Sequence, residues 1–376
     1  MKRLIYFTIV AVFIISCKKQ ATKINSSKLS AIISEVQDHK GYNEDEFPLG
    51  VFTKKYFQKE ADFAIERLKE LEQIHDENLS ETEKISLKLL KFKLQEIVDF
   101  NNFEMYLNPI LSDAGFHASL PYMVHPLADY QQIKKYLNKL NAIPNYVNQN
   151  LVLIREGLEE GVSQPKVIFK GYESSYDSHI VDNFEDSFFY SPFKKLPHTL
   201  TNAQKDSVLT VAKEAIEKNV TPQFKRIKTF FETEYLPKTR TSIGISEIPN
   251  GKEYYQNRIN YYTTSIQYTA EDIHQLGLKE VARIKKEMQQ VIDSVGFKGS
   301  FANFLYFLRN DNQFYAKTPK ELLIIARDIA KRIDAQLPRF FKTLPRKPYG
   351  VALVPDAIAP KYTAGRYIGT SKNSTD

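Results

Sequence analysis

Apolar residues recur every three or four positions along most of this chain, and that spacing restricts it to packed helices. The clearest case lies between Tyr56 and Ile74, where one helix face collects most of the apolar side chains. Such a face must be buried against a neighbouring element, because helix stability in proteins comes mainly from packing. The sequence therefore predicts a mainly α fold, a multi-helix array of antiparallel helices. The apolar positions of this helix are Phe57, Ala61, Ala64, Ile65, Leu68, Leu71 and Ile74.

The next helix is predicted to begin with a capping box, because Ser80 and Glu83 have the spacing at which each side chain binds the other's backbone N–H. We expect this helix to pack antiparallel to the 56–74 helix, since few residues separate the two. Its inward side chains are predicted to be Ile85, Leu89, Phe92, Leu94 and Ile97.

Helical patterns continue through the middle of the chain with one interruption. Pro144 lies near the predicted start of a helix, and Gly161 can end it by adopting the left-handed conformation. Between residues 164 and 195 the periodicity is lost, which predicts a long packed loop. Two further helices are expected between residues 201 and 236, divided at Thr221-Pro222, where a capping residue precedes a proline.

The last third of the chain combines two helices with a change of pattern. Thr269 and Asp272 start one helix, and Thr318-Pro319 starts another that should run to about Phe341. Beyond it prolines forbid a helix, and the β-branched residues of 351–354 predict a short β segment near the C-terminus. The first of these helices is predicted to bury Ile273, Leu276, Val281, Ile284, Met288, Val291 and Val295.

The N-terminus has the layout of an export signal. Lys2-Arg3 precede an apolar run, residues 4–15, that is too short to cross a bilayer comfortably. Cys17, the one cysteine of the chain, follows in the position of a lipoprotein processing site. We therefore expect residues 1–16 to be a signal peptide and Cys17 to carry lipid. A cytosolic protein with an incidental cysteine is the alternative.

The N-terminal signal also predicts how the rest of the chain is organised and where it is located. Residues 17–28 would be the lipidated cysteine and a flexible tether, residues 29–344 a helical domain, and residues 345–376 the start of a small β-containing segment. The protein would be held in the bacterial cell envelope by its lipid, facing the periplasm or the cell surface. Its net charge of +7 falls to +5 without the two basic residues of the signal, which is too modest to indicate a nucleic-acid partner.

Residues that carry chemistry are sparse, and their spacing matches no common catalytic motif. No HExxH pair, Gly-x-Ser-x-Gly turn or glycine-rich phosphate loop is present in the sequence, so it assigns neither a catalytic nor a metal-binding residue. Adjacent acids such as Glu159-Glu160 are explained by helix ends. For His117 and His125 we expect a loop or core histidine, not a metal ligand. The histidines are His39, His75, His117, His125, His179, His198 and His274.

A set of aliphatic, glycine, proline and tyrosine positions recurs in a recognisable order over about residues 104–376. In that order the chain resembles the bacterial family catalogued as domain of unknown function 885. The resemblance implies a zinc peptidase that hydrolyses peptide bonds, in which an HExxxH-type motif follows the Pro-Tyr-Gly-Val element. The positions are 136–137, Gly157, Gly161, Pro165, 191–193, 234–237, 251–255, 269–277 and 344–351.

The resemblance also implies which residues lie near a substrate. In such peptidases a strand beside the metal helix pairs with an extended peptide, and here the candidates for that edge are Tyr349, Gly350, Val351, Arg366 and Tyr367. A folded connector is an equally good interpretation of this segment. Because the sequence ends at Asp376 before any HExxxH run, we expect the chain to resemble a truncated member, without zinc and inactive.

Three further residues are candidates for a cleft. Tyr255 and Tyr262 come from pairs of adjacent tyrosines that cannot all face the core, and a tyrosine suits the binding of peptide groups. His274 belongs to the segment shared with the family, although a buried, hydrogen-bonded histidine is its commoner role. The competing hypothesis for the whole chain is a non-catalytic helical lipoprotein that binds peptide or glycan.

Overall fold

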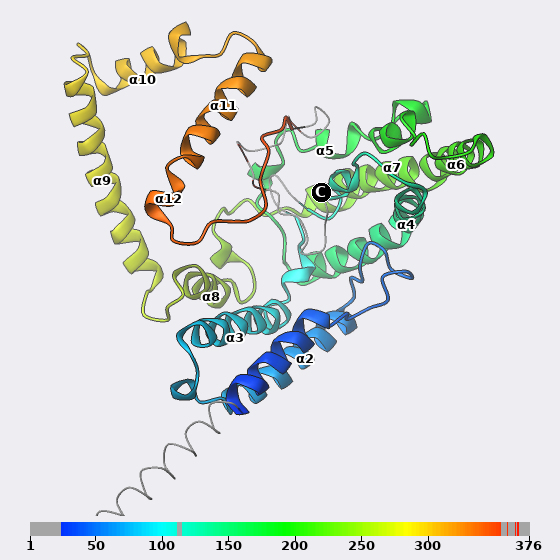
Figure 1. Cartoon of the computed structure of the whole chain (residues 1–376), viewed down its shortest axis with the longest axis horizontal. Helices are drawn as coiled ribbons and strands as arrows, with labels where there is room; N and C mark the ends of the chain where they lie inside the picture. Colours follow the sequence, from blue (N-terminus) through cyan, green and yellow to red (C-terminus); the bar gives the residue numbers. More distant parts are fainter. Residues whose placement is uncertain (1–23, 111–114, 355–358, 360–364, 366, 368–376) are drawn as a thin grey trace, which may run out of the picture. The chain divides into compact units, whose positions relative to one another are not determined.

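The computed structural model describes residues 24–110, 115–354, 359, 365 and 367, and they divide into two compact units (Figure 1). The first unit runs to Ser265 and the second begins at Ile266, inside the helical region predicted for residues 29–344. Both units are mainly helical, as the apolar periodicity predicts. Within the described residues no strand forms, and β pairing is limited to the isolated bridges Ile110–Gly115 and Pro165–Arg240.

The first unit begins with three helices that share one apolar cluster. They are the helix of residues 24–38, α2 (Lys54–Glu72) and α3 (Glu81–Asn102). The predicted capping box of Ser80 and Glu83 starts α3, and the predicted pairing of α2 with α3 is confirmed. Residues 24–28 are already helical, so this part of the predicted tether is corrected. The cluster contains Leu29, Ile32, Ala64, Leu71, Ile74, Leu79, Leu87, Leu90, Leu94 and Val98.

The face that α3 turns inward differs from the predicted one. Leu94 is buried as expected, but Ile85, Leu89 and Ile97 are exposed. The helix carries apolar residues on two sides, and α2 covers the side of Leu87, Leu90, Leu94 and Val98. Periodicity alone cannot choose between two apolar faces of one helix.

A long helix, α4 (Tyr130–Glu159), organises the main core of the first unit. It begins well before Pro144, which lies in its interior, because Asp129 caps its true start by accepting a hydrogen bond from the Gln132 N–H. Gly161 follows its end with a φ of +79°, in the left-handed conformation predicted for it.

A second helical run packs across α4. It comprises α6 (Asn202–Ala215), the π-helical turn η7 (Ile216–Val220), α7 (Thr221–Phe230) and the π-helical turn η8 (Phe231–Tyr235). Thr221 is the first residue of α7 and not its cap. The predicted packed loop consists mostly of short turns whose aromatic rings fill the same core. They are η4 (Lys166–Phe169), α5 (Ser174–Asp177), η5 (Phe184–Asp186) and η6 (Phe188–Lys194).

The first unit ends with α8 (Gly251–Thr263), which lies beside α3 (Figure 1). The remaining short helical turns join the longer helices. They are η1 (Asp76–Asn78), η2 (Met105–Leu107), η3 (Leu120–Met123), η9 (Leu236–Lys238) and η10 (Ile245–Glu247).

The second unit contains α9 (Ala270–Ser294), α10 (Phe301–Asn310), η11 (Asn312–Phe314), α11 (Pro319–Asp334) and α12 (Leu337–Phe340). The predicted caps at Thr269 and Thr318 start α9 and α11. The predicted end near Phe341 is wrong, because α11 stops at Asp334 and a short α12 follows.

The apolar stripe of α9 is not buried as predicted. Leu276, Val281, Ile284, Met288, Val291 and Val295 are exposed, and Ile292 is the residue that α9 buries. The helix is amphipathic as expected, but amphipathicity specifies only that a face can be covered and not which element covers it.

The short β segment predicted for residues 351–354 is also wrong. These residues form no strand, and the Val351 carbonyl oxygen accepts hydrogen bonds from Arg327 Nε and Nη2 at 3.1 and 3.0 Å. A strand needs a neighbouring strand to satisfy its backbone groups, and here a side chain of α11 satisfies the carbonyl instead.

No helix in the described part of the chain has both the length and the apolar character that a bilayer span requires.

Candidate functional site

The paired tyrosines of α8 divide between two faces of the helix. Tyr254 and Tyr261 are half-buried against α3, where Tyr261 stacks on Phe92 with ring centroids 4.9 Å apart. Tyr255 and Tyr262 are exposed and lie seven residues apart, so they share the outer face. Their placement is compatible with the substrate contact predicted from the sequence, which stays a prediction.

An arginine fixes α8 on α3. Arg258 donates from Nη1 and Nη2 to the two carboxylate oxygens of Glu96 at 2.7 and 2.8 Å, and its guanidinium lies 4.9 Å from the Tyr261 ring centroid. Asn257 adds a hydrogen bond to Asp99 at 2.8 Å. The pair is largely shielded from water, with side-chain exposures of 14% for Arg258 and 27% for Glu96. Such two-pronged, charge-assisted contacts are stronger than exposed ion pairs.

Replacing Arg258 by alanine should therefore lower the free energy of unfolding by about 1 to 2 kcal/mol. Lysine should recover less than half of that loss, because an ammonium cannot make both hydrogen bonds at once. Arg283→Ala is the control, since Arg283 pairs with acids of its own helix at half exposure and should change stability by about 0.5 kcal/mol or less. Urea denaturation followed by circular dichroism measures all three, and equal losses in the Arg258 and Arg283 variants would contradict this role.

His274 belongs to the second unit and lies in the early turns of α9. Its side chain is exposed. The expectation of a buried histidine at this position is therefore wrong, and the role near a substrate stays a prediction.

The predicted substrate edge lies against α11 as an irregular segment. The Tyr349 hydroxyl shares its one proton between Asp334 Oδ1 at 3.0 Å and the Ala330 carbonyl at 3.3 Å. Together with the Arg327 contact to Val351, these bonds hold residues 349–351 to one helix. Gly350 has no atom within 4 Å of the position a Cβ would take, so space does not require glycine there.

The other predicted site residues carry less structural information. Tyr367 is exposed. Arg366 and the predicted lipid site Cys17 lie outside the described residues.

Two buried histidines form a cluster that sequence reasoning did not single out as a site. His117 is fully buried and His179 nearly so, with Phe231 and Phe224 among the rings around them. Burial, with a smaller contribution from the neighbouring His179, lowers the pKa of His117 to about 3. Burial likewise lowers the pKa of His179 to about 4. Both rings are therefore neutral at ordinary pH.

The hydrogen bonds of this cluster define its chemistry. Ser175 Oγ lies 2.9 Å from His117 Nε2 and donates its proton to the Tyr172 carbonyl at 2.7 Å. The serine must therefore accept a hydrogen bond from His117, whereas a nucleophilic serine donates its proton to the histidine. No partner for either Nδ1 atom is found among the described residues. Ser175 is 58 residues from His117, so no local motif could have indicated this pair.

The family resemblance implies a zinc ion, which needs several ligand side chains placed together. Across the described residues no group of three or more histidine, cysteine, aspartate or glutamate side chains is placed to hold a metal ion. The buried histidine pair offers too few ligands for the usual three or four of a zinc site. The described residues therefore do not fit a zinc ion.

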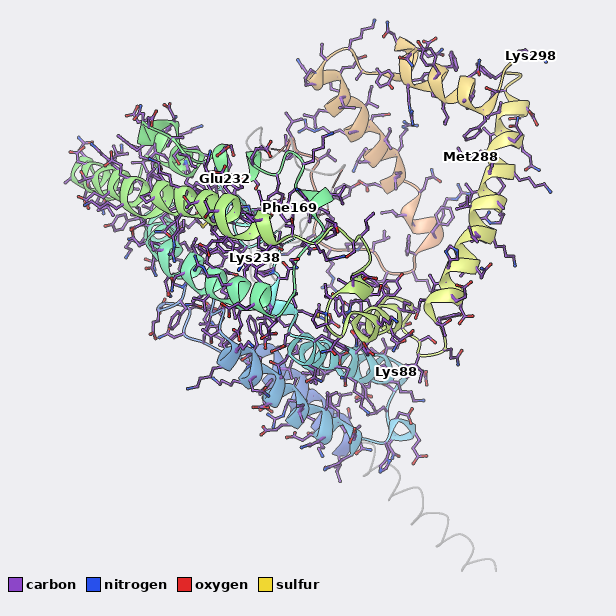
Figure 2. The ribbon with its side chains drawn as sticks, turned by 180° about the vertical axis from the view of Figure 1, so that it is seen from behind. Lys88, Phe169, Glu232, Lys238, Met288 and Lys298 are labelled. Atoms are coloured by element: carbon purple, nitrogen blue, oxygen red, sulfur yellow. The ribbon has the colours of Figure 1, made fainter. Side chains whose placement is uncertain are left out.

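A hollow in the second unit offers a different kind of site. It has a volume of about 640 Å³ and lies at the junction of α9 and α10, near Lys298 (Figure 2). Aromatic rings stand beside amides, with Phe297 and Phe307 separated by 5.4 Å between ring centroids. Such a lining suits a ligand that has both apolar and hydrogen-bonding groups. The lining residues are Phe297, Lys298, Ala302, Asn303, Tyr306, Phe307, Asn310 and Asp311.

Comparison with known proteins finds a family model and a solved structure to which this chain is similar. A family model described as "Bacterial protein of unknown function (DUF885)" matches residues 37–376, a longer stretch than the predicted 104–376. A solved structure of a candidate lipoprotein from Colwellia psychrerythraea aligns with a TM-score of 0.71 at 19% identity, covering 92% of this chain. At that identity the likeness shows the fold alone. The chain spans 62% of the length of that structure, and no curated protein matches the sequence.

Proposed function

Because this chain belongs to the DUF885 family of bacterial proteins, we propose that it supplies the helical, substrate-binding part of an exported zinc peptidase. In this proposal the chain binds peptide but does not cleave it, since its described residues do not fit a zinc ion. Hydrolysis would depend on groups that none of the described residues provides, and we assign no catalytic step to them.

The hollow at α10 is the observation that carries the proposal. Tyr306 and Phe307 offer apolar ring surface to a peptide side chain, and Tyr306 is 70% exposed. Asn303 can donate from Nδ2 to a peptide backbone and Asn310 can accept at Oδ1, because Asn303 Oδ1 already accepts from Ser300 and Asn310 Nδ2 already donates to the Tyr306 carbonyl. Lys298 and Asp311 add one charge of each sign, so both ends of a short peptide could be accommodated.

A glycan is the second candidate for the same hollow. Exposed aromatic rings such as Tyr306 can cover the apolar face of a sugar, and the neighbouring amides can bind its hydroxyl groups. Under this alternative the protein is a non-catalytic binding lipoprotein of the cell envelope.

The envelope location in both proposals rests on the N-terminal sequence. The basic residues, short apolar run and Cys17 have the order of a lipoprotein signal, and the matched Colwellia protein is described as a candidate lipoprotein. Lipid on Cys17 would hold the protein at a membrane without a membrane-spanning helix.

Peptide binding can be measured directly with the full chain. A fluorescein-labelled tryptic digest of casein should show increased anisotropy with the protein, without cleavage of casein. Tyr306→Ala should weaken binding several-fold, because a ring contact contributes about 0.5 to 1.5 kcal/mol. Phe340→Ala is the matched control, since this ring is 75% exposed and does not line the hollow.

The possible outcomes separate the two candidates. Binding of chitohexaose but not of casein peptides, measured by calorimetry, would replace the peptide proposal by the glycan alternative. Stoichiometric zinc in the purified chain or cleavage of casein would overturn the proposed division between binding and chemistry. An equal loss of peptide affinity in the Tyr306 and Phe340 variants would show that the hollow is not the binding site.

A further inference from the structure

The described chain begins beside the turn between α2 and α3. Asn25 donates from Nδ2 to the His75 carbonyl at 3.5 Å, Lys28 Nζ donates to Gln73 at 2.8 Å, and Ser26 hydrogen-bonds to Glu83. The proposed lipid site precedes Ile24 by seven residues, so the lipidated residue can lie at most roughly 25 Å from Ile24. The N-terminal end of α3 is therefore the part of the fold that an anchored chain brings to the membrane.

The outer face of α3 at this end is apolar and uncovered. Ile85 and Leu89 are 59% and 57% exposed and lie four residues apart, on the side opposite the buried cluster. Further along the same face Phe92 and Glu96 contact Tyr261 and Arg258 of α8. The uncovered part is thus confined to the half of α3 nearest the proposed anchor.

Lysines flank these two apolar residues. Lys88 and Lys93 are exposed and Lys91 is half-buried, and no ion pair of these three lysines is found within the part of the chain that the structure describes. Lys88 is labelled in Figure 2. On a helix, Lys88 falls on one side of Ile85 and Leu89 and Lys93 on the other, whereas Lys91 lies farther round, toward the buried Leu87. Apolar residues bordered by basic ones are the pattern of a helix that lies in a membrane interface.

A pocket of about 300 Å³ adjoins this face and suits a phosphate group. It opens between α3 and the turn before it, and Lys84, Lys88 and Lys91 line one side. Glu81 pairs with Lys84 at 2.8 Å, and Asp76 also lines the pocket. Lys88 and Lys91 therefore carry most of the attraction for an anion. We expect many weak headgroup contacts there and not one tight site.

We propose that the face of α3 formed by Ile85, Lys88, Leu89 and Lys93, together with Lys91 of the adjoining pocket, docks on the surface of the membrane that carries the lipid anchor. Its partner is a bilayer with anionic phospholipid headgroups, and Ile85 and Leu89 enter the interface. The inference rests on the proposed lipid at Cys17. Docking would fix the orientation of the first unit on the membrane, which a flexible tether alone does not do.

A fluorescent label at position 89 tests the docking. Cys17 is consumed by lipid, so in the full lipidated chain Leu89→Cys provides the one thiol that an NBD label can reach. In vesicles with roughly one third phosphatidylglycerol, NBD emission should rise several-fold and be quenched by headgroup-labelled nitroxide lipid. The matched control is Val211→Cys, an apolar residue of α6 that is 41% exposed, and α6 lies away from α3 (Figure 1).

The charge requirement is tested in the same labelled chain. Changing Lys88, Lys91 and Lys93 together to serine should abolish the rise, as should vesicles of phosphatidylcholine alone. Equal signals at positions 89 and 211, or equal signals with and without phosphatidylglycerol, would overturn the docking while the anchor stands. Mass spectrometry reports the anchor separately, and a chain without lipid on Cys17 would overturn the anchor and this inference with it.

Discussion

Phe231→Ala should destabilise the first unit by about 3 to 5 kcal/mol, the usual cost of removing a buried aromatic ring. Phe231 is fully buried in the π-helical turn η8. Its ring centroid lies 5.2 to 6.2 Å from those of six neighbours, so no single side chain can move to fill the space it leaves. The neighbours are His117, Phe169, Tyr172, Tyr176, Phe230 and Tyr235.

Urea denaturation measures this loss, and two variants make the comparison quantitative. Phe231→Leu keeps part of the volume and should fall between the wild type and the alanine variant. Tyr262→Ala removes a ring that is 79% exposed in the same unit and should change stability by about 0.5 kcal/mol or less. A loss below about 1 kcal/mol for Phe231→Ala would show that this ring does not organise the core.

Acidification should destabilise the first unit before most carboxylates are protonated. Burial holds the pKa of His117 at about 3 and that of His179 at about 4, both below the ordinary 6.5. Below pH 6.5 the two histidines therefore bind protons in the unfolded chain but not in the folded chain. The free energy of unfolding falls as the pH drops. Between about pH 7 and about pH 5 the loss should be on the order of 4 kcal/mol.

The pH slope of stability, not stability itself, identifies the two histidines. His117→Phe and His179→Phe should each remove about half of the slope, whatever their effect at neutral pH. His198→Gln is the control, because His198 is exposed and should leave the slope unchanged. Urea denaturation at a series of pH values gives each slope, and wild-type slopes in both phenylalanine variants would show that other groups drive the acid sensitivity.

Helix starts were the features best predicted from the sequence. The predicted capping residues Ser80, Thr269 and Thr318 each accept a hydrogen bond from a backbone N–H in the first turn of a helix. Caps are local, because the residues involved lie within four positions of each other. The start of α4 was misplaced at Pro144, since a proline is allowed both in a first turn and, at a cost, in a long packed helix.

Burial was predicted less well wherever a helix has a choice of partner. For α2 the predicted stripe is buried or partly buried, because a single apolar face leaves one solution. For α3 the apolar residues surround more of the helix, and α2 selected the side of Leu87 and Leu94. For α9 the predicted stripe exists but is exposed.

The candidate sites, like the buried faces, depend on packing that the sequence does not specify. Residues 349–351 were predicted as a substrate edge from their order in the family, and the structure shows an irregular segment bound to α11. The His117 cluster, the hollow at α10 and the lysine-flanked face of α3 were not predicted. Each depends on side chains or surfaces brought together, or left uncovered, by packing.

The sequence by itself determined the helical class, the ends of several helices and the family. Period, caps and motif order are properties of neighbouring residues, so they can be read without a fold. Tertiary structure alone decided which face of α3 is buried, that residues 351–354 form no strand, and that His117 meets Ser175. These outcomes depend on packing between segments far apart in the chain, where several arrangements satisfy the same local pattern.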